Sequence, residues 1–289
     1  MGYSARYHAT SLVAVFLALA IGVVIGAVLG GDTLTDTRKD LERSLTGNLE
    51  DARSHADQLS AELGRSMEFS ERVYPVLVRD ELDGQRIGLV ALGGLPDGLS
   101  AAIEDALGPT GGRLVGVGVV REPVELRALA GDLSRTRFAD IARNTDNQVA
   151  FGVGVGRQIV RGGNLLEHVR GRLFSRASGN FGGLDGVIVV RAQPQDMGPV
   201  QRSTAGRLEA ALISGMTTTD APAVGVETVA AEPSSIAFFG ANDLTSVDNV
   251  DVVAGKLATV LTLLGAEGSF GVKGSADSLL PDLLAPQRQ

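Results

Sequence analysis

The side chains that bind metals or do acid–base chemistry are few in this chain and lie far apart. The chain contains no cysteine, which excludes a thiolate ligand, a disulfide and a cysteine nucleophile. The three histidines, His8, His55 and His168, fall in three different regions without zinc-site spacing. The four methionines do not cluster, so no soft Cu(I) site is visible. We therefore expect no bound metal, and we interpret His168 as a packed or surface residue rather than a general base.

A glycine-rich loop at 93–98, GGLPDG, stands between an expected strand and an expected helix, where α/β proteins bind nucleotides. Its glycines lack the GxGxxG spacing, no GK[ST] follows, and a proline interrupts it, so we interpret it as a tight turn. A second run, GVGVG at 152–156, has no dependable strand before it. Dinucleotide binding is therefore not predicted at either place.

The stretch SVDNVD, residues 246–251, gathers Asp248, Asn249 and Asp251. Such a cluster can bind a ligand or partner. It can also cap the following helix, because Asp and Asn oxygens accept hydrogen bonds from free backbone N–H groups, and we favour capping. Asp185 and Asp196 flank an expected strand, but nothing pairs them as general acid and base. We therefore predict no catalytic residue and no cofactor, and we expect the protein not to be an enzyme.

The composition indicates one or two folded units with an aliphatic core. The chain has 289 residues, of which 44% are hydrophobic and only 4% aromatic. Its 38 glycines indicate many turns rather than disorder, because aliphatic residues remain frequent between them. The net charge of −8 argues against non-specific binding to nucleic acids, which requires a basic surface.

An uncharged segment at 9–31 follows a short N-terminal tail, residues 1–8. It is longer than the roughly 20 helical residues that cross the hydrocarbon core of a bilayer. A cleaved signal peptide is the alternative, but the best cleavage motif, Ala18-Leu19-Ala20, would leave only residues 12–17 as its apolar part. We predict an uncleaved transmembrane helix in the cell membrane.

The orientation we expect places the N-terminus in the cytoplasm and the C-terminal domain outside. Arg6 precedes the span, and Arg38, Lys39 and Arg43 follow it, so the count of basic residues does not by itself favour this orientation. We predict it because an N-terminal signal-anchor normally exports the chain that follows.

Small residues recur every four positions along the span and predict a surface for pairing with another helix. They are Ala14, Ala18, Gly22, Gly26 and Gly30. Small side chains let two backbones approach closely in lipid. The alternative is that glycine and alanine are simply common in membrane helices.

Residues 32–73 are rich in charge and leucine and predict a coiled-coil stalk. Its apolar seam comprises Leu34, Leu41, Leu45, Leu49, Ala52, Ala56, Leu59 and Leu63. Heptad spacing holds from Leu49 onward, and the 4–4 step before it is a stutter. The alternative is a single amphipathic helix lying on its own domain. Because two alanines make the seam thin, we expect a weakly paired homodimer whose stalk accepts a partner helix.

Residues 84–274 predict an α/β sandwich with a central, mainly parallel sheet. Apolar runs at 86–92 and 113–120 flank a helical segment, the pattern of a βαβ unit. We expect mostly helix over 123–175 and a tail without regular structure at 275–289. Further strands are expected at 184–191, 221–229, 234–240 and 268–274, and further helices within 202–216 and 246–265.

The order of these parts and three stretches of sequence resemble the actinobacterial MctB family. The stretches are RYHATSLVAVFLALAIGVVIGAVLG, LTSVDNVDVVAGKLATVLTLL and GSFGVKG. Members are named for copper transport and described as channel-forming outer-envelope proteins. Corynebacterial relatives called SteB resemble membrane-anchored regulators that recruit or activate a peptidoglycan hydrolase during cell separation, together with a cytoplasmic partner, SteA.

The resemblance thus implies two functions, which the residues help to separate. An outer-membrane channel needs a closed barrel of alternating strands about 10 residues long, whereas the strands expected here are continuous apolar runs. No metal ligands carry over from the family. We therefore favour an interaction protein that regulates a cell-wall hydrolase, with a helical segment of that hydrolase and a SteA-like cytoplasmic protein as partners. Copper transport is the alternative.

Overall fold

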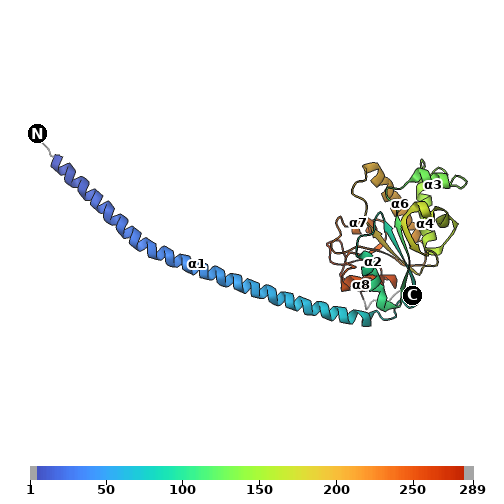
Figure 1. The fold of residues 1–289 in the computed structure, drawn as a ribbon, viewed down its shortest axis with the longest axis horizontal. Coiled ribbons are helices and arrows are strands. Elements are labelled where there is room, and N and C mark those ends of the chain that lie inside the picture. The colour runs from blue at the N-terminus through green and yellow to red at the C-terminus, as the bar shows by residue number, and fades with distance from the viewer. Residues whose placement is uncertain (1–4, 283–289) are drawn as a thin grey trace. The chain divides into compact units, whose positions relative to one another are not determined.

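The computed structural model describes the backbone of residues 5–282 and the side chains of residues 8, 10–28 and 41–282. The chain divides into two units between Met67 and Glu68. The first unit belongs to one long helix, α1 (Ala5–Leu77), which is coloured blue to cyan in Figure 1. Within it, Thr10–Val28 is long and apolar enough to cross a membrane. The expected span and stalk are therefore both helical.

The last turns of α1 belong to the second unit and pack against it. Tyr74 in α1 and Val78 just after it are buried there, and the Tyr74 hydroxyl donates to the Ala106 carbonyl oxygen at 2.6 Å. The helix runs past the expected end of the stalk at residue 73 and includes Pro75 in its last turn. A proline lacks the N–H that would bond the carbonyl four residues earlier, and the buried residues Tyr74 and Val78 hold the turn despite this loss.

A seven-stranded sheet forms the centre of the second unit, in the order β3-β2-β1-β4-β5-β6-β7. Every pairing is parallel except that of β3 with β2. The strands are β1 (Arg86–Leu92), β2 (Arg113–Val120), β3 (Phe174–Gly179), β4 (Gly186–Arg191), β5 (Ala223–Val226), β6 (Thr245–Val247) and β7 (Ser269–Phe270). The expected α/β sandwich with a mainly parallel sheet is confirmed.

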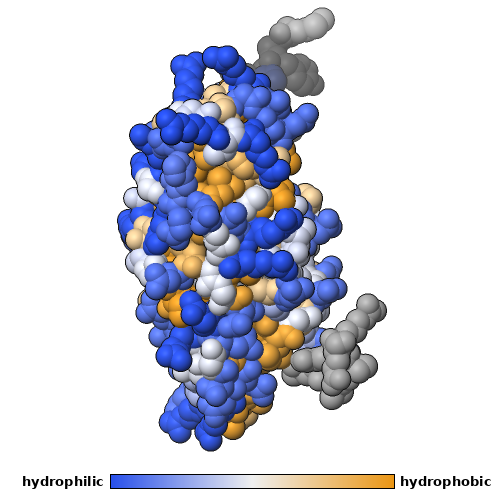
Figure 2. Space-filling view, turned by 90° about the vertical axis from the view of Figure 1, so that its right-hand side faces the viewer, coloured by the Kyte–Doolittle hydropathy of each residue, from blue (hydrophilic) through white to orange (hydrophobic). Residues whose placement is uncertain are grey.

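Helices cover both faces of the sheet, which explains why its inner strands are continuous apolar runs. One face packs against α4, α5, α6 and α7, and the other against α2, α8 and the end of α1. The helices are α2 (Leu99–Leu107), the 3-10 turn η1 (Gly108–Thr110), α3 (Leu126–Asp132), α4 (Thr145–Arg161), α5 (Asn164–Leu173), α6 (Pro199–Thr217), α7 (Ile236–Gly240) and α8 (Val253–Leu263). In the view of Figure 2 the outer surface is mostly hydrophilic, with separate hydrophobic patches.

Glycines let α4 and α6 approach closely, and this explains the GVGVG run. Gly152 and Gly156 lie inside α4 on the side that faces α6. A Cβ on Gly156 would overlap the Leu212 carbonyl oxygen, and one on Gly215 of α6 would overlap the Val153 carbonyl oxygen. The run therefore serves helix packing.

The expected strand at 234–240 is wrong, because this segment contains helix α7. The Ser234 hydroxyl and the Ser235 N–H donate to the Glu227 carboxylate at 2.7 and 2.6 Å, which fixes the turn before the helix. Phe239 then packs over Gly225 on the sheet. These tertiary contacts outweigh the local preference of isoleucine and phenylalanine for strands.

Strand β3 was not expected, since its residues follow directly on a helical pattern. Phe174 at its start is buried and stacks on Phe181, with ring centroids 5.4 Å apart. Both rings pack over Gly118 of β2, which has no side chain to hinder them. Aromatic packing on this glycine therefore holds the chain against β2.

The C-terminal segment is more ordered than expected, at least up to residue 280. Asp277 donates its N–H to the Ser269 carbonyl oxygen at 2.8 Å, and its carboxylate accepts from the Ser269 N–H at 3.1 Å. The first part of the expected tail is thus bound to β7. Residues 1–4 and 283–289 lie outside the described residues.

Candidate functional site

The carboxyl ends of the parallel strands meet along one edge of the sheet, which we call the carboxyl edge. In open α/β sheets, ligands bind at this edge where neighbouring strands lead away in opposite directions. Here that point lies between β1 and β4, because β1 leads to β2 on one side and β4 to β5 on the other. The GGLPDG loop at 93–98 leaves β1 at this point.

Two glutamates, Glu122 and Glu209, form a buried acid pair beside this point. Glu122 follows β2, and Glu209 lies on α6 with its side chain 1% exposed. One oxygen of Glu209, Oε2, accepts from Arg191 Nε at 3.0 Å and from Gln193 Nε2 at 2.9 Å. The other, Oε1, and both oxygens of Glu122 are buried and have no other donor among the described groups.

We interpret the two carboxyl groups as sharing one proton. The pKa of Glu122 is raised to about 9, mainly by burial and further by the negative charge of Glu209 and a hydrogen bond to it, while Arg191 opposes the shift. Glu122 is therefore protonated at neutral pH and supplies the donor that the Glu209 oxygen needs. The remaining carboxylate balances the Arg191 guanidinium, which is also held 4.0 Å above the centre of the Phe238 ring.

Gly93 makes room for the acid pair. Its φ is +84°, and a Cβ there would lie 2.6 Å from the Ala192 carbonyl oxygen and 2.8 Å from Glu122 Oε2. The loop after β1 is thus a turn packed against its own chain. Because the carboxyl oxygens are buried, we interpret the pair as a structural contact that holds the ends of β1, β2 and β4 together. We do not interpret it as an acid–base pair that faces a substrate.

The predicted polar cluster follows β6 at the same edge, but it does not cap α8. The N-cap of α8 is Val252, which makes no side-chain capping bond. Asn249 is fully buried, its side-chain amide has no hydrogen-bond partner among the described groups, and its backbone lies against Gly255 in the first turn of the helix. The capping interpretation is therefore wrong for this helix.

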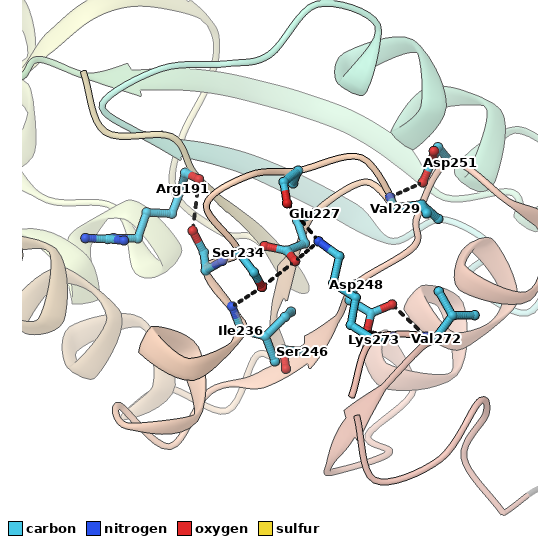
Figure 3. Close-up of polar contacts among 12 residues, drawn as sticks. Arg191, Glu227, Val229, Ser234, Ile236, Ser246, Asp248, Asp251, Val272 and Lys273 are labelled. Carbon is cyan, nitrogen blue, oxygen red and sulfur yellow. Dashed lines mark hydrogen bonds and ion pairs between the residues drawn. The ribbon is translucent and has the colours of Figure 1, made fainter. Parts of the chain in front are cut away.

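The two aspartates of the cluster instead bind backbone N–H groups of neighbouring loops. Asp248, which is fully buried, accepts from the N–H groups of Val272 and Lys273, both at 2.8 Å (Figure 3). Asp251 accepts from the Val229 N–H at 2.9 Å. These carboxylates fix the loops that follow β5 and β7 to the end of β6.

A partly buried ion pair reinforces the same region. Lys273 Nζ lies 2.6 Å from Glu227 Oε1, with side-chain exposures of 21% and 5% (Figure 3). The same glutamate binds Ser234 and Ser235 before α7. The Ser235 hydroxyl donates to the Arg191 carbonyl oxygen at 3.2 Å and so links this ion pair to the acid pair.

Neither the acid pair, Glu122 and Glu209, nor the ion pair, Glu227 and Lys273, was predicted from the sequence. Glu227 and Lys273 carried a weak signal, since one is a single acid in an apolar run and the other is one of only three lysines. The sequence gives no signal for Glu122 or Glu209, because each lies in a segment where an acidic residue is expected on the surface. Only the topology of the sheet brings them together.

The residues predicted to pair helices lie on the surface of α1. No atom lies within 4 Å of a Cβ built on Gly22 or Gly26. The leucines of the seam are between 51% and 67% exposed where the structure describes them. Ala14, Ala18, Ala52 and Ala56 are exposed as well. Gly30 and Leu34 lie where only the helix backbone is described, and pairing itself stays a prediction.

The histidines and methionines that the structure describes do not gather into one site. His168 is exposed and its Nε2 lies 2.8 Å from the Asp132 carbonyl oxygen, as expected for a surface residue. Met197 and Met216 are buried and Met67 lies exposed on α1. Within the part of the chain that the structure describes, no group of three or more His, Asp or Glu residues could hold a metal ion.

One candidate membrane helix followed by one α/β unit defines the class: a single-pass, membrane-anchored α/β protein. The family model described as "Copper transport outer membrane protein, MctB" matches residues 3–281. The chain belongs to this family. Its class and its family describe an envelope-associated protein related to copper transport. A comparison with curated proteins finds no match.

Proposed function

We propose that the protein is a membrane-anchored interaction protein that recruits or activates a peptidoglycan hydrolase during cell separation. The observation that carries the proposal is the continuity of α1. Its apolar span, Thr10–Val28, runs into a helix whose regularly spaced leucines are exposed. A row of exposed apolar side chains of this kind marks a surface suited to covering by another helix. The N-terminus lies in the cytoplasm and the α/β unit outside.

In this proposal the seam binds a second copy of the chain weakly and a helix of the hydrolase more strongly. Small residues at Ala52 and Ala56 give little contact between two copies but leave room for larger side chains of a partner. An ordered stalk of about 40 residues would be roughly 60 Å long, and the thin part of the seam lies about halfway along it. A SteA-like protein would contact the cytoplasmic end.

Deleting the gene separates the proposed function from its alternative. Chains of unseparated cells with normal copper tolerance support hydrolase regulation. Normal separation with hypersensitivity to copper contradicts it.

The substitution Ala52→Leu tests the seam directly. A leucine fills the thin part of the seam between two copies, so self-association should strengthen and capture of the hydrolase by the purified full-length protein should weaken. Each buried leucine adds about 2 kcal/mol of apolar burial relative to an exposed one. Ser54→Leu, which places the same side chain on the opposite side of the helix, is the matched control. Unchanged capture by Ala52→Leu would contradict a shared seam.

Copper transport is the second candidate, and the description of the family favours it. Copper would then be cargo rather than a resident cofactor. One span cannot enclose a pore, so this function needs several copies to assemble in the membrane.

A further inference from the structure

We propose that the outer edge of β3 binds an extended, acidic segment of another protein, which joins the sheet as an additional strand. β3 ends the sheet on one side, and its residues Ser175–Gly179 are all exposed. The strand at the other end, β7, has only two residues, and the chain around Asp277 is bound to it. Among the described strands, β3 therefore presents the longer open edge.

The register of β3 shows which of its backbone groups are free to bind. Ser178 and Arg176 stand opposite Val117 and Val119 of β2, and the N–H of Asn180 donates to the Val115 carbonyl oxygen. In an antiparallel pair, alternate residues turn their N–H and C=O groups toward the neighbouring strand. The intervening residues, Ala177 and Gly179, therefore turn these groups away from β2, where an added strand would lie. The Gly179 carbonyl oxygen already accepts from Arg170, so among the described contacts an added strand would bind both groups of Ala177 and the N–H of Gly179.

Arginines surround this edge, although the chain as a whole is acidic. Arg170 donates to the Gly179 carbonyl oxygen at 2.8 Å, and Arg121 donates to the Phe174 carbonyl oxygen at 3.3 Å, so they mark the two ends of β3. Arg176 lies exposed between them. Among the described residues, none of these three guanidinium groups forms an ion pair.

The positive charge of these three arginines favours one kind of binding partner at the β3 edge. A strand that carries carboxylates beside its backbone would gain charge-assisted hydrogen bonds from the guanidinium groups at both ends of β3. A second copy of the chain would instead bring its own arginines against these, and like charges across a strand pair are destabilising. Charges on edge strands commonly guard against such self-pairing. The chemistry therefore favours an acidic peptide over a homodimer through this edge.

A hollow beside the edge offers room for one apolar side chain of the added strand. It has a volume of about 650 Å³ and lies between α2 and the start of β2. Leu107, Leu114 and Val117 line it on one side, and the small residues Ser178 and Gly179 of β3 border it. Because β3 has no large side chain there, an apolar residue of the partner can reach across it.

A labelled model peptide tests the proposal on the full-length protein in detergent micelles. The probe is a fluorescein-labelled peptide of ten residues that alternates glutamate and threonine, and fluorescence anisotropy measures its binding. We expect saturable binding that the double variant Arg170→Glu, Arg176→Glu weakens at least tenfold, while Arg207→Glu, which changes an exposed residue of α6, leaves it unchanged. Ala177→Pro removes an outward N–H without touching the pairing with β2, and it should also weaken binding.

A second peptide distinguishes strand addition from binding by charge alone. The same peptide N-methylated at alternate residues keeps its charge but loses the backbone donors of one edge. Equal affinity for the methylated and unmethylated peptides overturns strand addition. If neither peptide binds at millimolar concentration, the proposal is overturned as well. It is also overturned if the protein self-associates and Ala177→Pro abolishes that self-association. Circular dichroism of each variant verifies that the fold is retained.

Discussion

At the residue scale, the polar side chains of the carboxyl edge bind the chain itself. Asp248 and Asp251 accept backbone N–H groups, Lys273 pairs with Glu227, and Glu122 is the protonated partner of a buried carboxylate. Buried polar groups are tolerated only when they are hydrogen-bonded, so each of these contacts also fixes a loop in one position. The edge where many α/β proteins bind ligands is held closed here by internal contacts.

The acid pair predicts a dependence of stability on pH. The pKa of Glu122 is about 9 in the folded protein and 4.5 in its ordinary state. The folded chain thus keeps a proton that the unfolded chain releases. The stabilisation is complete below about pH 4.5 and is lost as the pH rises toward 9. Glu122→Gln keeps a neutral donor at every pH, so its free energy of unfolding in urea should fall less between pH 5 and pH 9.

The nearby variant Glu125→Gln changes an exposed glutamate and serves as the control. Its pH profile should match that of the unaltered protein. Identical slopes for all three proteins would show that Glu122 is already ionised in the folded state.

At the element scale, the sheet depends on helices that pack unusually close to one another. The glycines at positions 152, 156 and 215 let the backbones of α4 and α6 approach until side chains would overlap. Glycine inside a helix is unfavourable by about 0.5–1 kcal/mol relative to alanine. Close approach of two helix backbones is one of the few reasons for its presence there.

The substitution Gly156→Ala should therefore destabilise the α/β unit. A methyl group there overlaps the Leu212 carbonyl oxygen, and overpacking of this kind costs about 1–3 kcal/mol. Gly171→Ala in α5, where no atom lies within 4 Å of an added Cβ, should be neutral or stabilising by up to about 1 kcal/mol. Thermal unfolding compares the two variants, and equal melting temperatures would contradict the packing account.

The elements that the sequence predicts are those that local pattern alone determines. The apolar runs at 86–92, 113–120 and 184–191 became β1, β2 and β4 because strands buried on both faces need no alternation. Helix α7 and strand β3 were not predicted, since both depend on contacts outside the local pattern: Ser235 with Glu227 and Phe239 with Gly225 for α7, and Phe174 with Gly118 for β3. The acid pair was not predicted either, because only the folded sheet brings its two glutamates together.

At the scale of the whole molecule, one helix joins the membrane span to the α/β unit. α1 includes the small residues of the span and the leucines of the stalk without a break in helical structure. If two copies pair through the span, the same pairing can continue along the stalk, because both surfaces belong to one helix.

Pairing within the membrane is tested by Gly26→Ile. A bulky side chain on the small-residue surface separates the two backbones, and model interfaces of this type depend on close approach. Chemical crosslinking through the span in native membranes should fall several-fold. Val24→Ile, which enlarges the opposite side of the helix, should leave crosslinking unchanged. Equal crosslinking by both variants would mean that the glycines only reflect the composition of membrane helices.

The most direct test of the central claim, that the stalk pairs through its seam, uses the absence of cysteine from the chain. Single cysteines are introduced at Ala52 and Ala56 on the seam and at Ser54 on the opposite side, and disulfide formation is measured in native membranes after mild oxidation. Two cysteines form a disulfide only when their Cα atoms come within about 7 Å. We predict covalent dimers for Ala52→Cys and Ala56→Cys and none for Ser54→Cys. Equal amounts of dimer at all three positions, or none at any, would contradict the account.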